Sequence, residues 1–295
     1  MGRVELGALV VTRGNPEQAL SGAPSSWSST WPVLGKTVLE RWLDRVQHLG
    51  AGMVSVVRSD AQLPNVLQTM CGWANEGVER ILLILLGSYA EVDLLDVVQF
   101  HSRTQNQVTR VFDPEGPLGI SLYDRGEVLR HRGGSSNATK LPARYDFSGY
   151  VTRLSSIGSY RQLVLDALNG SCGIRPAGSQ QQDGIWIDPS AKVHSSVQIQ
   201  APCFIGRNVR LRAGVVIKQY CSIEEGSEID IGTTIDQSSI LPYTYIAPGL
   251  NVRHAVVDGT RLQHIDRGVT VDLGRAGLSA GLAQSISSPG GLSPE

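Results

Sequence analysis

The sequence has 295 residues, a formal net charge of −1 and 41% apolar residues. Such a chain can bury one or two cores, and its balanced charge gives no reason to expect a nucleic-acid partner. Its longest apolar run, residues 81–86, is far too short to span a bilayer, and no charged-then-apolar leader opens the chain, so we expect a cytoplasmic protein without a membrane partner.

The first part of the chain alternates short apolar runs with amphipathic segments. We predict strands at residues 4–11, 53–57, 80–86, 107–112, 120–123, 128–130 and 150–154, and helices at residues 37–49, 61–74, 92–102 and 159–168. This alternation indicates a mostly parallel sheet with helices on both faces. A ligand crevice is then expected outside the carboxyl ends of the strands, at residues 11–14 and 86–88.

After a polar linker at residues 179–183, an apolar residue recurs every six positions. The members of this series are Ile187, Val193, Ile199, Ile205, Leu211, Ile217, Ile223 and Ile229. A period of six fits neither an amphipathic helix nor a single half-buried strand, but it fits a chain that turns a corner every six residues. Three short strands would close one coil, so Cys203 and Cys221, eighteen residues apart, should stack in adjacent coils as buried thiols.

An α/β domain followed by this repeat resembles the sugar-nucleotide pyrophosphorylase (nucleotidyltransferase) family. The local matches are residues 32–40 (PVLGKTVLE), 82–101, 156–170 and 235–257. The resemblance implies a nucleotidyltransferase-like, Rossmann-like α/β domain at residues 1–178 and a hexapeptide left-handed parallel β-helix at residues 184–262. Residues 263–295 would form a partly disordered tail.

The chemistry of that family transfers a nucleotide from a nucleoside triphosphate to a sugar 1-phosphate. It uses a glycine-rich loop that cradles phosphates and Mg²⁺ held by carboxylates. The resemblance places the loop at residues 11–15, where Gly14 is the single glycine, and places the two metal-binding carboxylates at Ser88 and Ser156. Because a neutral hydroxyl is a poor substitute for an anionic Mg²⁺ ligand, we expect no cofactor if catalysis is lost, and Mg²⁺ if it is not.

Several residues near the expected crevice remain candidates for binding. The candidates for a nucleotide or its phosphates are Thr12, Arg13, Gly14, Lys36, Gly87 and Ser88. Asp146 is a candidate for a displaced metal ligand, whereas Asp93 is expected to open a helix. Trp27 and Trp31, in a Gly/Ser-rich loop, need an apolar surface and are candidates to fill the crevice.

Three functions stay open from the sequence. The first is a regulatory, sensing or structural subunit of nucleotide-sugar or polysaccharide metabolism that binds a nucleotide or nucleotide sugar, or an active paralogue. The second is an active pyrophosphorylase with displaced metal ligands. The third is a hexapeptide acyltransferase with His194 or His254 as general base. In each case the flat faces of the repeat, with Tyr220, Tyr243 and Tyr245, are expected to form a homo-oligomer.

Overall fold

The computed structural model describes residues 4–13, 31–59, 64–132 and 141–272. Their contacts divide the chain into two compact units. The first unit contains the described residues up to Arg13 and Thr37–Ser159, and the second contains Trp31–Lys36 and the residues from Tyr160 onward. The short segment Trp31–Lys36 thus belongs with the C-terminal part of the chain.

The first unit is built on a six-stranded sheet with the strand order β4-β1-β5-β8-β7-β9. The strands are β1 (Leu6–Arg13), β4 (Met53–Ser59), β5 (Arg80–Leu86), β7 (Val108–Asp113), β8 (Gly116–Asp124) and β9 (Ala143–Asp146). β1 is parallel to β4 and β5, and β7 is parallel to β9, whereas β8 is antiparallel to both of its neighbours. This is the α/β architecture with parallel strands that the alternating pattern predicts.

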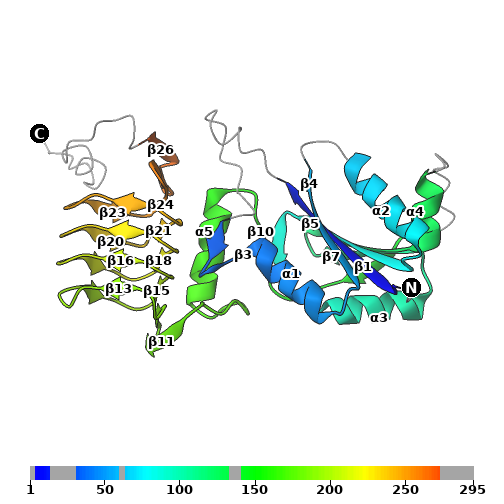
Figure 1. Cartoon of the computed structure of the whole chain (residues 1–295), viewed down its shortest axis with the longest axis horizontal. Coiled ribbons are helices and arrows are strands. Elements are labelled where there is room, and N and C mark those ends of the chain that lie inside the picture. Colours follow the sequence, from blue (N-terminus) through cyan, green and yellow to red (C-terminus); the bar gives the residue numbers. More distant parts are fainter. Residues whose placement is uncertain (1–3, 14–30, 60–63, 133–140, 273–295) are drawn as a thin grey trace, which may run out of the picture. The chain divides into compact units, whose positions relative to one another are not determined.

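Helices cover both faces of this sheet (Figure 1). Helices α2 (Pro64–Glu76) and α4 (Arg125–Arg132) lie on one face, and α1 (Val38–His48) and α3 (Leu94–Thr104) lie on the other. One apolar core forms between β1, α2 and α4, with Leu9, Met70, Trp73 and Val128 among its buried residues. Burial of such side chains on both sides explains why β5, with the sequence RILLILL, is almost entirely apolar.

Helix α1 begins where its sequence predicts. The Thr37 hydroxyl accepts a hydrogen bond from the Glu40 amide at 3.0 Å, and the Glu40 carboxylate accepts one from the Thr37 amide at 2.7 Å. This capping box satisfies backbone donors that the first helical turn leaves unpaired. Val38, Trp42 and Val46 recur every four residues and are buried.

The predicted strand at residues 128–130 is wrong, because these residues belong to α4. A strand pattern and a helix pattern are hard to tell apart over so few residues. The helix is supported by Val128, which is buried in the core below α2, and by an ion pair between Glu127 and Arg130 at 2.6 Å, one helical turn apart. Tertiary packing therefore decided between the two patterns.

The second unit stacks short parallel strands in three sheets. The first sheet contains β12 (Ile185–Ile187), β15 (Cys203–Ile205), β18 (Cys221–Ile223), β21 (Ser239–Ile240) and β24 (Ala255–Asp258). The second contains β13 (Lys192–Val193), β16 (Arg210–Leu211), β19 (Glu228–Ile229) and β22 (Tyr245–Ile246). The third contains β14 (Gln198–Ile199), β17 (Val216–Ile217), β20 (Thr234–Asp236) and β23 (Asn251–Arg253).

The register of these strands follows the six-residue period. Ile187 pairs with Ile205 and Ile205 with Ile223, so each strand of the first coils lies on the one eighteen residues later, whereas from Ile223, which pairs with Ile240, the offset is seventeen. The predicted stacking of Cys203 on Cys221 is confirmed. Burial raises the pKa of the Cys203 thiol to about 12 and that of Cys221 to about 11, so both remain neutral thiols in the core.

Antiparallel strands extend the first sheet of this stack at both of its ends. Residues 179–183, predicted as a polar linker, instead contain β11 (Ser179–Gln182), which pairs with β12. At the other end, β25 (Arg261–His264) pairs with β24, and β26 (Val269–Asp272) pairs with β25. Polar strands suit this position because an uncovered end strand would expose a row of unpaired backbone groups. The predicted tail beyond residue 272 lies outside the described residues.

A buried carboxylate fixes the hairpin formed by β2 (Pro32–Val33) and β3 (Lys36–Thr37) within the second unit. Glu224, fully buried on the first sheet, accepts hydrogen bonds from the amides of Leu34 and Gly35, both at 3.0 Å. Gly35 has φ +91°, and a Cβ there would lie 2.6 Å from that of Ala177, so the turn requires glycine. The Glu224 carboxylate therefore stabilises this tight turn through hydrogen bonds from the amides of Leu34 and Gly35.

Candidate functional site

The carboxyl ends of β1 and β5 lie side by side, as expected. Thr12 pairs with Leu86 in the parallel register, so Gly87 and Ser88 follow directly beside the end of β1. Gly87 is exposed and its carbonyl accepts a hydrogen bond from the Leu154 amide at 2.9 Å. Gly14 and the side chain of Arg13 lie outside what the structure describes. The fold thus brings together Thr12, Gly87 and Ser88 from the predicted phosphate-binding set.

Ser88 is buried, with 6% of its surface exposed, and opens the short strand β6 (Ser88–Ala90). Its hydroxyl donates to the Leu118 carbonyl at 3.3 Å. Strand β6 pairs antiparallel with β10 (Val151–Arg153), and this pairing sets Ser88 opposite Arg153. The hydroxyl is therefore used within the fold, and a cationic side chain stands beside the position that the resemblance assigns to a metal carboxylate.

Ser156, the second such position, caps helix α5 (Ile157–Leu168). Its hydroxyl accepts from the Ser159 amide at 3.1 Å, and the Ser159 hydroxyl accepts from the Ser156 amide at 3.0 Å. This reciprocal pair is the serine form of a capping box. Ser156 follows β10 by three residues, so the chain brings both metal positions of the resemblance to the β6–β10 ribbon, but neither holds a carboxylate.

Arg153 joins this region through two carboxylates of the segment that connects β7 to β8. It forms an ion pair with Asp113 and a second one, at 3.0 Å, with Glu115. Asp113 is 6% exposed and also accepts from the amides of Glu115 and Gly116, at 3.0 and 2.8 Å. The buried negative charge is thus neutralised by an arginine and by the turn that joins β7 to β8. The sequence Asp-Pro-Glu-Gly at residues 113–116 is a turn signal for this connection.

Asp146, the candidate for a displaced metal ligand, ends β9 and is 70% exposed. Its carboxylate lies 2.5 Å from Arg144 Nε. Asp93 caps α3 by accepting hydrogen bonds from the amides of Leu95 and Asp96, at 2.9 and 3.4 Å, so its predicted helix-opening role is confirmed. Both acids are engaged within the fold.

Lys36 and Trp31 belong to the second unit. Lys36 is exposed in β3. The Trp31 ring packs edge-to-face on the buried Tyr160, with 5.3 Å between ring centroids, and the Tyr160 hydroxyl donates to the Pro32 carbonyl at 2.7 Å. This packing supplies the apolar surface that a tryptophan in a Gly/Ser-rich loop needs. Trp27 lies outside the described residues.

The candidate base for acyl transfer, His194, is exposed, and its Nδ1 lies 2.8 Å from the Ser196 hydroxyl. The second candidate, His254, lies 3.2 Å from Asp266. Tyr243 and Tyr245 are exposed, as expected for interface candidates, whereas Tyr220 is half-buried. The Tyr245 hydroxyl donates to Asp230 at 2.7 Å.

Within residues 4–13, 31–59, 64–132 and 141–272, no group of three or more His, Cys, Asp or Glu side chains is arranged to hold a metal ion. None of the helices in the same ranges is long and apolar enough to span a membrane. The sequence matches no protein-family model, and a comparison with curated proteins finds no match either.

Proposed function

We propose that this chain is a sugar-nucleotide pyrophosphorylase-like protein that has lost nucleotidyl transfer. It would act as a regulatory, sensing or structural subunit in the nucleotide-sugar or polysaccharide metabolism of the cytoplasm. The first unit would be a nucleotidyltransferase-like, Rossmann-like domain, and the stacked strands of the second unit would form a left-handed β-helix. Its ligand would be a nucleotide or nucleotide sugar, and its protein partner an active paralogue.

The observation that carries this proposal is that the hydroxyls of Ser88 and Ser156, at the two positions that the resemblance assigns to metal carboxylates, make hydrogen bonds within the fold. Mg²⁺ binding needs carboxylate oxygens that the fold leaves available. Here one hydroxyl bonds a backbone carbonyl and the other caps a helix. Because neither position supplies a carboxylate oxygen, the residues present at these two positions do not fit a magnesium site.

Asp146 does not restore such a site in its present conformation. Its ion pair with Arg144 would have to break before the carboxylate could serve as a metal ligand. The pair is exposed and therefore weak, so it can be tested directly. The alternative of an active enzyme with displaced ligands depends on this residue.

A turnover assay tests the proposal. The full-length protein is incubated with each nucleoside triphosphate, a panel of sugar 1-phosphates and Mg²⁺, and pyrophosphate release is measured. We expect no release above the rate without protein. Mg²⁺-dependent release that is lost in Asp146→Asn, but kept in the control Asp183→Asn at an exposed position of the second unit, would instead establish the active enzyme.

The second unit is proposed to mediate self-association. Its second sheet carries exposed Tyr243 and Tyr245 at one end, and tyrosine is enriched in protein interfaces. Analytical ultracentrifugation should show a symmetric homo-oligomer that Tyr243→Glu weakens, whereas a monomer at all concentrations would contradict this assembly.

A further inference from the structure

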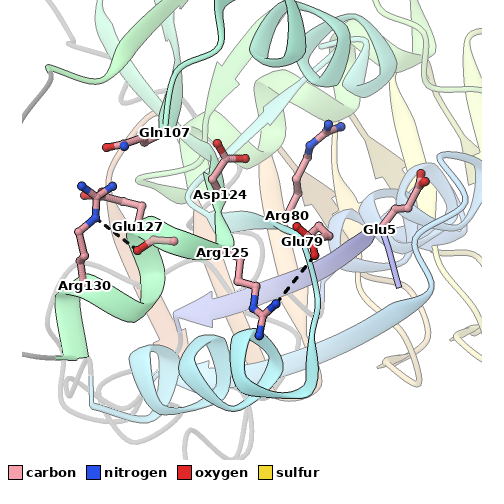
Figure 2. Close-up of a pocket in the computed structure, with 9 residues that line it drawn as sticks. Glu5, Glu79, Arg80, Gln107, Asp124, Arg125, Glu127 and Arg130 are labelled. Carbon is pink, nitrogen blue, oxygen red and sulfur yellow. Dashed lines mark hydrogen bonds and ion pairs between the residues drawn. The ribbon is translucent and has the colours of Figure 1, made fainter. Parts of the chain in front are cut away.

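A pocket of about 530 Å³ opens in the first unit at the end of the sheet opposite to the carboxyl ends of β1 and β5. Figure 2 shows the charged and polar side chains that line it, which are Glu5, Glu79, Arg80, Gln107, Asp124, Arg125, Glu127 and Arg130. The lining includes no aromatic residue. Its size is that of a small-molecule site, and its chemistry is that of a polar ligand.

The frame of this pocket is made of paired backbone. The Arg80 amide donates to the Glu5 carbonyl at 3.1 Å, the Arg125 amide to the Glu79 carbonyl at 2.8 Å, and the Asp124 amide to the Gln107 carbonyl at 2.9 Å. These bonds tie the starts of β1, β5 and β7 to the end of β8. The side chains of the lining are therefore carried by fixed strand ends, which favours a preformed site.

Two pairs of charges in the lining satisfy each other. Glu127, whose side chain is 7% exposed, lies 2.6 Å from Arg130. Arg125 donates from Nε to the Ala74 carbonyl at 2.7 Å, and its Nη1 lies 3.9 Å from Glu79. These four charges cancel in pairs and form the walls of the pocket.

The Asp124 carboxylate contacts a buried histidine, His101. His101 is 2% exposed, and its Nε2 lies 3.1 Å from Asp124 Oδ1, while its Nδ1 lies 2.8 Å from the Thr109 hydroxyl. The Asp124 side chain itself is 42% exposed on the pocket side. This arrangement fixes Oδ1 on the histidine, and among the described residues no hydrogen bond involves Oδ2 of this pocket-lining carboxylate.

Three lining residues have side-chain polar groups that find no partner within the part of the chain that the structure describes. Among the described residues, no hydrogen bond or ion pair involves the side chains of Arg80, Gln107 or Glu5, and Figure 2 shows the Arg80 guanidinium and Asp124 as neighbours on the wall. Apart from the charges that pair within the lining, the pocket has one guanidinium, that of Arg80, and two carboxylates, those of Glu5 and Asp124. A simple anion would face Asp124 and Glu5, and a simple cation would face Arg80.

We propose that this pocket binds a small zwitterion of the amino-acid class. Its carboxylate would lie on the Arg80 guanidinium, whose fork of donors matches a carboxylate, and its ammonium group would lie on Asp124. Gln107, which can both donate and accept, would orient the bound molecule. The site is separate from the crevice of the proposed function and does not depend on it.

Calorimetric titration of the full-length protein with each of the protein amino acids, one at a time, tests this proposal. Inorganic phosphate and putrescine serve as probes of a single charge sign. We expect at least one amino acid to bind, and Arg80→Ala and Asp124→Asn each to weaken its affinity by about tenfold or more. Arg210→Ala, an exposed arginine of the second unit, is the matched control and should leave the affinity unchanged.

Three results would overturn the proposal. One is the absence of binding by every amino acid, and another is binding of phosphate or putrescine alone. The third is amino-acid binding that survives both Arg80→Ala and Asp124→Asn. If Asp124→Asn disturbs folding through His101, Gln107→Ala takes its place, because no hydrogen bond of a described residue depends on the Gln107 side chain.

Discussion

The two ends of the six-stranded sheet use their charges in opposite ways. At the carboxyl ends of β1 and β5, Arg153 neutralises Asp113, and the hydroxyl of Ser88 is bonded to the backbone. At the other end, Arg80 and Asp124 face a pocket, the first without a partner among the described residues and the second held by a buried histidine. At the crevice end, the charges of Arg153 and Asp113 pair with each other, whereas at the pocket end Arg80 has no partner among the described residues.

This difference separates structural charges from binding charges. A buried charge that is paired and hydrogen-bonded stabilises the fold and has little capacity left for a ligand. A charge that faces a pocket without a partner contributes little to stability but can recognise a ligand. The same contrast predicts which substitutions will unfold the protein and which will only alter binding.

The largest loss of stability is expected from Glu224→Ala in the second unit. Removing the carboxylate leaves the amides of Leu34 and Gly35 without this acceptor, at a cost of about 3 kcal/mol in the free energy of unfolding. Glu224→Gln keeps one acceptor oxygen and should lose about half as much. Scanning calorimetry measures both, and a change below about 0.5 kcal/mol for the alanine variant would show that the hairpin is held in another way.

Arg153→Ala should have the second-largest effect, lowering the free energy of unfolding by about 2 kcal/mol, because it leaves the buried charge of Asp113 without its ion pair. Arg144→Ala is its matched control. That arginine pairs with the exposed Asp146 and lies over the Phe112 ring, so its removal should cost less than about 1 kcal/mol. Urea unfolding of both variants compares them. Equal losses would contradict the view that Arg153 is the structural charge of this end.

Arg80→Ala is expected to change the free energy of unfolding by less than about 0.5 kcal/mol. The reason is that its side chain makes no hydrogen bond or ion pair with a described residue. The same urea experiment tests this expectation. A loss of stability as large as that of Arg153→Ala would show that the Arg80 charge stabilises the fold.

The smallest effect is expected from Asp188→Asn, and it should depend on pH. Hydrogen bonds from the Ser190 hydroxyl and amide lower the pKa of the Asp188 carboxyl below its usual value of 3.8. A lowered pKa gives stability that is present above the unfolded-state pKa and is lost as the pH falls through the folded-state value. The variant should therefore be less stable than the wild type at pH 7 and equal to it at strongly acidic pH. A constant difference across the pH range would assign the effect to lost packing.

The stacking of strands in the second unit was predictable because its repeat is encoded by branched aliphatic residues at one spacing. Each position of the series from Ile187 to Ile229 follows the coil register that the structure shows. The closing strand β11 was missed because its sequence, SQQQ, has no apolar pattern and its pairing depends on the edge of β12. Helix α4 was missed because its packing against α2 decides its conformation.

The carboxyl-end region was predictable only in part. The apolar runs of β1 and β5 predict two strands of a parallel sheet, so the approach of their carboxyl ends, where Thr12 pairs with Leu86, could be expected. The role of Arg153 could not, because its partner Asp113 lies on a distant strand and the pair forms only in three dimensions. The pocket was also missed, since its lining comes from the starts of β1 and β5 and the end of β8, where no local motif gathers.

Calorimetric titration with nucleoside triphosphates and nucleotide sugars, with and without Mg²⁺, tests the central claim most directly. The claim is that the end of the sheet bearing Ser88 no longer supports metal-dependent chemistry. The account predicts that Mg²⁺ will neither create nor strengthen binding to the protein in any titration, whether a nucleotide sugar binds without the metal or nothing binds at all. Micromolar binding that appears only with Mg²⁺ would contradict it and would favour the alternative proposal of an active enzyme with displaced metal ligands.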